Sequence, residues 1–108
     1  MAEKPWKRTE RKVAELLGGE RIPVNGRIRG SAPDIAHDTL SLEVKSRKSI
    51  PAWLTEALEQ ATASTAEGSD KLPVAVIHQQ GKPHTDSLCV IRLKDFAAYI
   101  KDEESRYV

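Results

Sequence analysis

The sequence predicts one small α/β domain in which a central mixed β-sheet is flanked by helices. Its 108 residues can enclose one modest hydrophobic core. Segments whose apolar residues recur at helical spacing alternate with short segments of strand-like alternation. The near-continuous apolar run LPVAVIH at residues 72–78 is typical of a central strand covered on both faces. No repeat or linker divides the chain, so residues 1–108 are expected to form a single domain.

The first predicted element is a helix over residues 5–17, because a proline suits its first turn and the pair Gly18-Gly19 suits a stop. One narrow stripe of this helix holds Trp6, Glu10, Val13 and Leu17. Glu10 is therefore expected in the middle of the apolar face, whereas Glu15 points the opposite way.

Three strands are expected next, at residues 21–24, 33–37 and 40–45. Pro23 places the first of them near a sheet edge. A tight turn at Asp38-Thr39 joins the other two into a hairpin.

The second half of the chain should hold a helix, two strands and a last helix. The helix is capped by Ser49 and ends near Ala66, and its apolar stripe comprises Leu54, Ala57, Leu58 and Ala61. The strands cover residues 72–78 and 87–93, and the last helix, over residues 95–103, buries Phe96, Tyr99 and Ile100. The predicted order is α-β-β-β-α-β-β-α, with a right-handed parallel crossover between the strands at 40–45 and 72–78.

Composition excludes several classes of protein. The single cysteine, Cys89, cannot form a disulfide framework within one chain, and it is expected to be a small buried hydrophobe. No apolar run reaches the ~20 residues that span a bilayer, and the charged N-terminus has no signal-peptide core. The sequence therefore predicts a soluble, intracellular protein without a membrane partner.

Positive charge is concentrated in two segments, although the net charge is only +1. Residues 4–12 carry five cations and one anion, and residues 27–48 carry a second group of cations. The cations that could contact phosphates are Lys7, Arg8, Arg11 and Lys12 on the first helix, and Arg27, Arg29, Arg47 and Lys48 near the hairpin. The alternative is an ordinary solvated basic surface.

The register of the hairpin follows from its apolar residues. A two-residue turn at Asp38-Thr39 pairs Ile35 with Leu42, and Asp34 with Glu43. Opposite residues have Cβ atoms about 4.5–5.5 Å apart, so the two carboxylates repel each other unless a divalent cation lies between them. Mg²⁺ prefers one or two carboxylates together with waters and phosphate oxygens. The pair Asp34 and Glu43 is therefore a candidate magnesium site.

Two more residues suit this site. Lys45 lies two positions after Glu43, hence on the same face, where its amine can meet the same phosphate. Glu10 can approach from the neighbouring helix, and an unpaired carboxylate on that apolar face would otherwise be costly. The alternative is that Glu43 and Lys45 form an exposed pair and that Asp34 is a turn residue.

At these residues the chain resembles the PD-(D/E)XK nuclease superfamily and, within it, the archaeal and phage Holliday junction resolvases. The resembling stretches are TERKVAELL (9–17), APDIA (32–36) and LEVKSRK (42–48), and the likeness covers roughly the first 65 residues. The resemblance implies a restriction-endonuclease-like fold, a cytoplasmic protein of a prokaryotic or phage-infected cell, and cleavage of four-way DNA junctions. Because one chain carries one active site and junction resolution needs two symmetric nicks, a homodimer is expected.

The resemblance also assigns roles. Asp34 and Glu43 bind Mg²⁺ with the backbone carbonyl of Val44, Lys45 is the catalytic lysine, Glu10 is the helix glutamate, and Ser31 and Gln60 are further candidates. Mn²⁺ is expected to substitute for Mg²⁺. The implied reaction is phosphodiester hydrolysis, in which Lys45 orients the attacking water or stabilises charge in the transition state. Glu10 either holds a water of the metal or helps to bind a second ion.

Several alternatives remain open at this stage. The chain could be another nuclease of the superfamily (a nickase, a repair enzyme or a restriction-type enzyme), a non-catalytic DNA-binding module, or a protein-interaction domain. Gln60 could be an ordinary amide on a helix surface. Trp53 could pack at a subunit interface or in the core, and the core is favoured. His37, His78 and His84 share no motif spacing and are expected not to bind metal.

Overall fold

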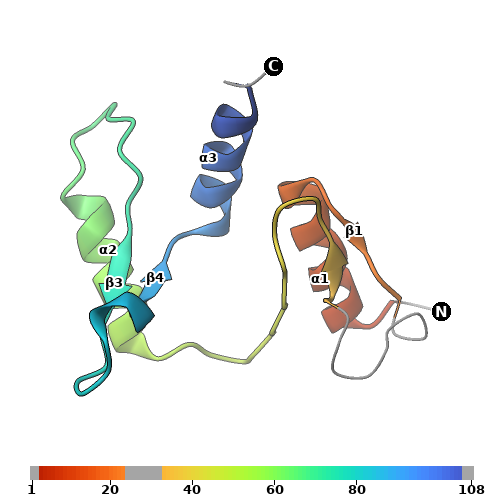
Figure 1. Ribbon diagram of the computed structural model, residues 1–108, viewed down its shortest axis with the longest axis horizontal. Coiled ribbons are helices and arrows are strands. Elements are labelled where there is room, and N and C mark those ends of the chain that lie inside the picture. Colours follow the sequence, from red (N-terminus) through yellow and green to blue (C-terminus); the bar gives the residue numbers. More distant parts are fainter. Residues whose placement is uncertain (1–2, 24–32, 106–108) are drawn as a thin grey trace. The chain divides into compact units, whose positions relative to one another are not determined.

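The structure of the chain is a computed structural model that describes residues 3–23 and 33–105. The described residues form three α-helices and two small antiparallel sheets, so the prediction of an α/β protein is confirmed (Figure 1). They fall into two compact units, Met1–Lys48 and Ser49–Val108. The single domain over residues 1–108 stays a prediction.

The first unit begins with helix α1 (Pro5–Leu17), which has the predicted bounds. Proline occupies its first turn, and Gly18 ends it in the left-handed conformation, with φ of 76° and its N–H donated to the carbonyl of Ala14. The buried residues of α1 are Glu10, Ala14 and Leu17, so the apolar face lies where the helical spacing placed it. Trp6, at the same stripe, remains 40% exposed.

Strands β1 (Glu20–Arg21) and β2 (Ile35–Ala36) pair antiparallel, and β1 packs against α1. Arg21 is the register partner of Ile35, which is fully buried. Both strands are shorter than predicted, and Val24, the expected end of the first, lies outside the described residues.

The segment at residues 40–45 is not a strand, so that prediction is wrong, whereas the predicted pairing of Ile35 with Leu42 is confirmed. Ile35 and Leu42 form an isolated antiparallel bridge, and the Asp34 N–H donates to the Leu42 carbonyl at 3.0 Å. The ladder does not continue because the Val44 N–H donates to the Asp34 side chain. Local side-chain hydrogen bonds of this kind compete with sheet pairing.

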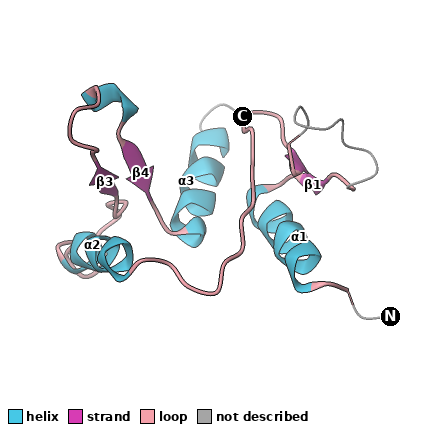
Figure 2. Ribbon diagram, turned by 90° about the horizontal axis from the view of Figure 1, so that it is seen from below, coloured by secondary structure: helices cyan, strands magenta, loops and turns pink. Residues whose placement is uncertain are grey.

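The second unit comprises helix α2 (Ala52–Ala63), strand β3 (Ala75–Ile77), the 3₁₀ turn η2 (His84–Asp86), strand β4 (Leu88–Val90) and helix α3 (Leu93–Ser105). Strands β3 and β4 pair antiparallel, and α2 packs on β3 (Figure 2). The predicted apolar stripe of α2 is confirmed, since Leu58 is buried and Leu54, Ala57 and Ala61 are half-buried.

The ends of these helices differ from the predictions. Helix α2 starts after Pro51, with no side-chain cap, so the expected Ser49 cap is wrong. Helix α3 starts at Leu93, earlier than expected, because the Arg92 carbonyl accepts the N–H groups of Asp95 and Phe96. Leu93 therefore belongs to a helix and not to the preceding strand.

Four residues of the second unit that were expected to be buried are exposed. Val76 and Cys89 are register partners on the outer face of the β3–β4 sheet, where Val76 is 65% exposed and the Cys89 thiol is exposed. Trp53 is 57% exposed, so it does not lie in the core of its unit. Tyr99 is likewise 50% exposed on α3, whose buried contact is made by Ala97.

The central mixed sheet of the predicted restriction-endonuclease-like fold stays a prediction. Both sheets formed by the described residues are two-stranded and antiparallel. The predicted parallel crossover from the segment at 40–45 to the strand at 72–78 links one unit to the other, and it stays a prediction. None of the described helices is long and apolar enough to cross a membrane.

Candidate metal centre

Asp34 is tied to the segment that carries the other candidate residues. It precedes β2, and its backbone N–H donates to the Leu42 carbonyl at 3.0 Å. Its Oδ2 accepts the Val44 N–H at 2.6 Å. The expected ligands Asp34 and Val44 are therefore neighbours, and the carboxylate of Asp34 lies beside the residue that follows Glu43.

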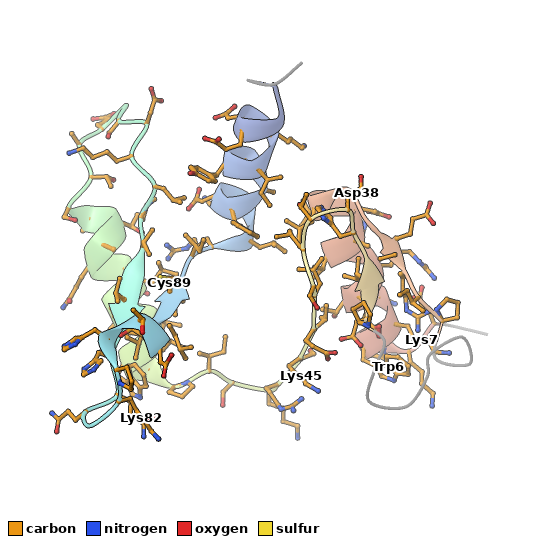
Figure 3. The ribbon with its side chains drawn as sticks, viewed as in Figure 1. Trp6, Lys7, Asp38, Lys45, Lys82 and Cys89 are labelled. Atoms are coloured by element: carbon orange, nitrogen blue, oxygen red, sulfur yellow. The ribbon has the colours of Figure 1, made fainter. Side chains whose placement is uncertain are left out.

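The segment after the turn keeps the predicted alternation, although it is not a strand. Leu42 and Val44 are half-buried, while Glu43 and Lys45 are exposed. Figure 3 shows Asp38 at the turn and Lys45 further along this segment. Glu43 and Lys45 thus lie on the solvent side of the segment to which Asp34 is bonded. A shared cation between Asp34 and Glu43 stays a prediction.

Glu10 is buried as predicted, with 4% of its surface exposed. The structure gives it a partner that the sequence did not reveal: the Nε of Arg21 lies 3.5 Å from its Oε2. The argument that the burial of Glu10 needs a metal to explain it is therefore wrong, because an ion pair already offsets part of the cost of burial. A role for Glu10 at a metal rests on the resemblance and on its place in the first unit.

The other predicted catalytic residues lie apart from this cluster. Ser31 lies outside the described residues. Gln60 is exposed on α2, in the second unit. Its surroundings match those of an ordinary amide on a helix surface, and its part in a site stays a prediction.

The predicted phosphate contacts fall into three groups. Arg27 and Arg29 lie outside the described residues. Arg47 and Lys48 are exposed after Lys45, and Arg47 donates to the Ser46 carbonyl at 2.9 Å. On α1, Arg8 is exposed, and the Nζ of Lys7 lies 5.4 Å from the centroid of the Trp6 ring (Figure 3).

Two of the helix cations have acidic neighbours. Arg11 forms an ion pair with Glu3, and Lys12 lies 3.5 Å from a carboxylate oxygen of Glu15. Exposed ion pairs of this kind are weak and yield to competing charges such as phosphates. The basic face of α1 is therefore compatible with either a solvated surface or a DNA contact.

His37 has a role that the sequence did not reveal. Its Nε2 lies 2.8 Å from the Leu17 carbonyl, and its Nδ1 accepts the N–H groups of Thr39 and Leu40 at 3.1 and 3.2 Å. Because Nδ1 accepts, the proton of the neutral ring is on Nε2, which donates to Leu17. The side chain thus joins the end of α1 to the hairpin turn.

His78 and His84 come together although they share no motif. Their rings stack in parallel with centroids 4.5 Å apart, and Nε2 of His78 lies 2.9 Å from the Lys82 carbonyl. A pocket of about 630 Å³ beside them is lined by apolar and polar groups, among them Trp53, His78 and Leu88. No sequence signal marks this pair, because the two rings meet only when the turn after β3 brings η2 back towards the strand.

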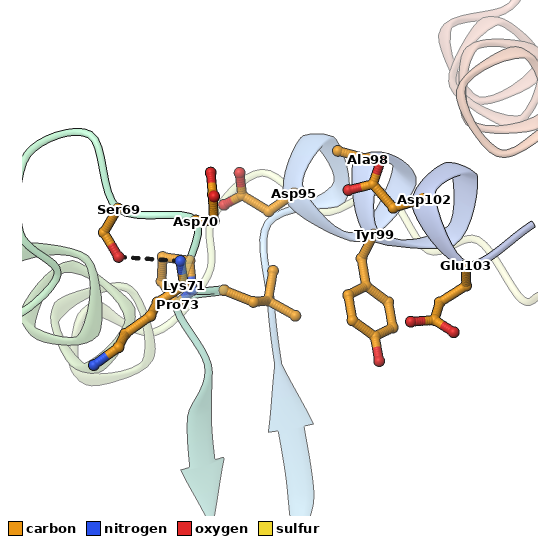
Figure 4. Close-up of a pocket in the computed structure, with 10 residues that line it drawn as sticks. Ser69, Asp70, Lys71, Pro73, Asp95, Ala98, Tyr99, Asp102 and Glu103 are labelled. Carbon is orange, nitrogen blue, oxygen red and sulfur yellow. Dashed lines mark hydrogen bonds between the residues drawn. The ribbon is translucent and has the colours of Figure 1, made fainter. Parts of the chain in front are cut away.

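A second pocket, of about 560 Å³, lies where the start of α3 and its exposed face meet the loop before β3 (Figure 4). Its lining is acidic and includes Asp70, Asp95, Asp102 and Glu103. The Lys71 N–H donates to Ser69 Oγ at 3.1 Å in this loop. An acidic lining does not suit a phosphate, so this pocket is not a candidate for a DNA contact.

The donor types of the predicted site suit Mg²⁺, because carboxylates and a backbone carbonyl are the oxygen ligands that hard cations prefer. The hydrogen bond from the Val44 N–H to the Asp34 carboxylate brings these two residues together. Within residues 3–23 and 33–105, no three His, Cys, Asp or Glu side chains are grouped so as to hold a metal ion. Comparison with protein-family models, with curated proteins and with solved structures finds no match for the chain.

Proposed function

We propose that the chain is a Mg²⁺-dependent DNA endonuclease of restriction-endonuclease-like fold that cuts four-way junctions. The observation that carries this proposal is the attachment of Asp34 to the Glu43-Val44-Lys45 segment. Asp34 reaches the backbone of Val44 at 2.6 Å, while Glu43 and Lys45 remain exposed on either side of it. A site that acts on a polymer must present its groups to solvent in this way.

The residues would divide the chemistry among them. Asp34, Glu43 and the Val44 carbonyl would hold the ion, with Glu10 in support. A bound Mg²⁺ supplies charge stabilisation at a phosphate oxygen and acidifies water. Lys45 is exposed and positively charged, so it can orient the attacking water or stabilise the charge that develops on the phosphate.

Binding of DNA would rest on the exposed cations of the first unit. Arg8 on α1 and Arg47 and Lys48 after the site present positive charge to solvent. The net charge of a single chain is only +1, and two chains in a homodimer would double the basic surface offered to a junction. A two-fold axis would also place one site on each of two opposed strands.

A panel of synthetic substrates tests the proposal and separates its rivals. The chain is incubated with Mg²⁺ and a four-way junction, a flap or a plain duplex of the same sequence. Paired symmetric nicks in the junction alone support resolution. Equal cutting of all three supports a different nuclease of the same fold, binding without cutting supports a DNA-binding module, and no retention of DNA at low salt removes a nucleic-acid function altogether.

A further inference from the structure

We propose that Trp6 contacts DNA directly, by stacking its indole ring on a base that is unpaired or lies at an interrupted stack, as at the crossover of a four-way junction. The inference rests on the proposed function, because its ligand is DNA, and it adds a residue that is not among the predicted contacts. Two features of the first unit carry it: an exposed aromatic ring on α1 and the cations that lie around this ring.

Trp6 departs from the burial pattern of its own helix. It shares a stripe with Glu10 and Leu17, which are both buried, yet 40% of Trp6 is exposed. An indole ring offers a large flat apolar surface, and such rings contribute strongly to contacts with partners. A single exposed apolar residue is common at protein surfaces, so the groups around the ring decide what it can bind.

Two cations lie against the ring. The Nζ of Lys7 is 5.4 Å and the guanidinium carbon of Arg21 is 5.6 Å from the ring centroid, within the range of cation–π contacts (Figure 3). The Arg21 side chain is only 16% exposed and forms an ion pair with Glu10, so it is a fixed neighbour that orients the indole. Lys7 is half-buried, and its long flexible side chain can leave the ring for a phosphate.

Further positive charge lies close to Trp6 along the chain. Lys4 and Arg8 are exposed, and α1 has no acidic residue in its first turn. Glu3, the nearest acidic residue in the sequence, forms an ion pair with Arg11. The start of a helix favours acidic side chains, so cations at this place oppose the stability of the helix. Charge that is unfavourable to the helix and complementary to phosphate suits a polyanion as partner.

An aromatic ring among cations matches the chemistry of unpaired nucleic acid. Stacking of bases on aromatic rings and contacts between cations and phosphates act together in proteins that bind single strands. The base pairs of a continuous duplex are stacked on both faces, so Trp6 would find a free base face only where the stack is interrupted. Trp6 would therefore favour a junction over a plain duplex, whereas a solvated basic surface would favour neither.

The fluorescence of Trp6 tests the inference without relying on cleavage. The chain contains two tryptophans, and Trp53→Phe, a change at a residue that is 57% exposed, leaves Trp6 as the only one. This full-length variant is titrated at low salt, without divalent metal, with single-stranded oligothymidylate or with an abasic oligomer of the same length. We expect saturable quenching by oligothymidylate and none by the abasic oligomer, which carries the phosphates without the bases.

Affinity measures how much the stacking contributes. Trp6→Ala removes the ring, so it should bind labelled oligothymidylate about fivefold or more weakly than the wild type, as measured by fluorescence anisotropy. Trp6→Phe keeps an aromatic ring and should fall between the two. Trp53→Ala removes a more exposed indole from α2 and should bind like the wild type. The quenching of Trp6 in Trp53→Phe remains decisive should Trp6→Ala fail to fold.

Two results overturn the inference alone. Equal quenching by the abasic oligomer would mean that Trp6 responds to phosphates only, and wild-type affinity in a folded Trp6→Ala chain would mean that the ring adds nothing. If Trp6 is not quenched in a chain that still cuts junctions, the stacking contact is refuted and the proposed function survives. Quenching in a chain that cuts no DNA supports the contact and contradicts the nuclease, whereas a chain that neither binds oligothymidylate nor cuts a junction contradicts both.

Discussion

At the residue scale, Asp34 combines a structural contact with its proposed chemical role. Its Oδ2 accepts the Val44 N–H at 2.6 Å. The same contact ends the sheet ladder and sets the path of the segment that carries Glu43 and Lys45. Its two roles can be separated, because an amide oxygen can replace the hydrogen bond but not the charge.

Asp34→Asn and Asp34→Ala should therefore differ in stability. The asparagine can still accept the Val44 N–H, so its loss in free energy of unfolding should be smaller than that of the alanine variant. The alanine leaves a half-buried N–H without its acceptor and should cost about 1 kcal/mol. Urea denaturation followed by circular dichroism measures both. Equal losses in the two variants would show that the hydrogen bond does not set the path of the segment.

Glu10 shows what the sequence can and cannot predict for one residue. Its burial follows from helical spacing alone, since it lies on the same stripe as Leu17. Its partner does not, because Arg21 follows the helix stop and faces Glu10 only through the pairing of β1 with β2. A carboxylate on an apolar face thus indicates a buried charge without indicating whether an arginine or a metal compensates it.

At the element scale, His37 fixes the end of α1 to the hairpin turn. Its ring bonds the Leu17 carbonyl on one side and the N–H groups of Thr39 and Leu40 on the other. These are groups that a helix end and a tight turn leave without backbone partners. The turn that presents Glu43 and Lys45 is therefore held by a side chain as well as by its one backbone bridge.

His37→Phe keeps an aromatic ring at this position, slightly larger than imidazole, and removes both nitrogens. We expect a loss of about 1–2 kcal/mol in the free energy of unfolding, because the helix carbonyl and the turn lose their partners. The exposed His84→Phe is the matched control and should change stability by less than about 0.5 kcal/mol. A His37→Phe chain as stable as the control would mean that the contact does not hold the turn.

The two glycines after α1 make a second prediction for this element. Gly18 has φ of 76°, and a methyl group added to it would meet open space, so Gly18→Ala opposes only the backbone preference, about 1 kcal/mol. A Cβ on Gly19 would lie 2.5 Å from the Ala36 carbonyl oxygen and 2.8 Å from Ile35 Cγ2. Gly19→Ala should therefore be the more damaging, by about 1–3 kcal/mol. Thermal unfolding of the two variants measures both losses of stability. A larger loss for Gly18→Ala than for Gly19→Ala would contradict the close approach of the chain after α1 to β2.

Elements with strong local signals were predictable and those set by partners were not. Helix α1 has the predicted bounds because a proline and the pair Gly18-Gly19 mark both ends. The register of Ile35 with Leu42 follows from the apolar match around the turn. The length of the segment at 40–45 as a strand did not follow, because alternation does not show that Asp34 takes the N–H of Val44. Outer-face residues such as Cys89 were misplaced for a related reason, since an apolar run does not reveal which face a helix covers.

At the scale of the whole molecule, charge is divided unevenly between the two units although its sum is small. The exposed cations Arg8, Arg47 and Lys48 belong to the first unit, whereas the acidic pocket belongs to the second. Binding through contacts between cations and phosphates weakens as salt is added. The logarithm of the binding constant falls linearly as the logarithm of the salt concentration rises. The proposed function thus requires DNA binding that is strong at low salt and mediated by the unit that carries the candidate site.

The most direct test of the central claim is single-turnover cleavage of a labelled four-way junction in Mg²⁺, with binding to the same junction measured in parallel. Wild type should make paired nicks, and Asp34→Asn and Lys45→Ala should bind the junction yet cut it at least about 100-fold more slowly. The exposed Lys94→Ala serves as the control and should cut like the wild type. Cleavage at the wild-type rate by both site variants, or none by the wild type itself, would contradict the account.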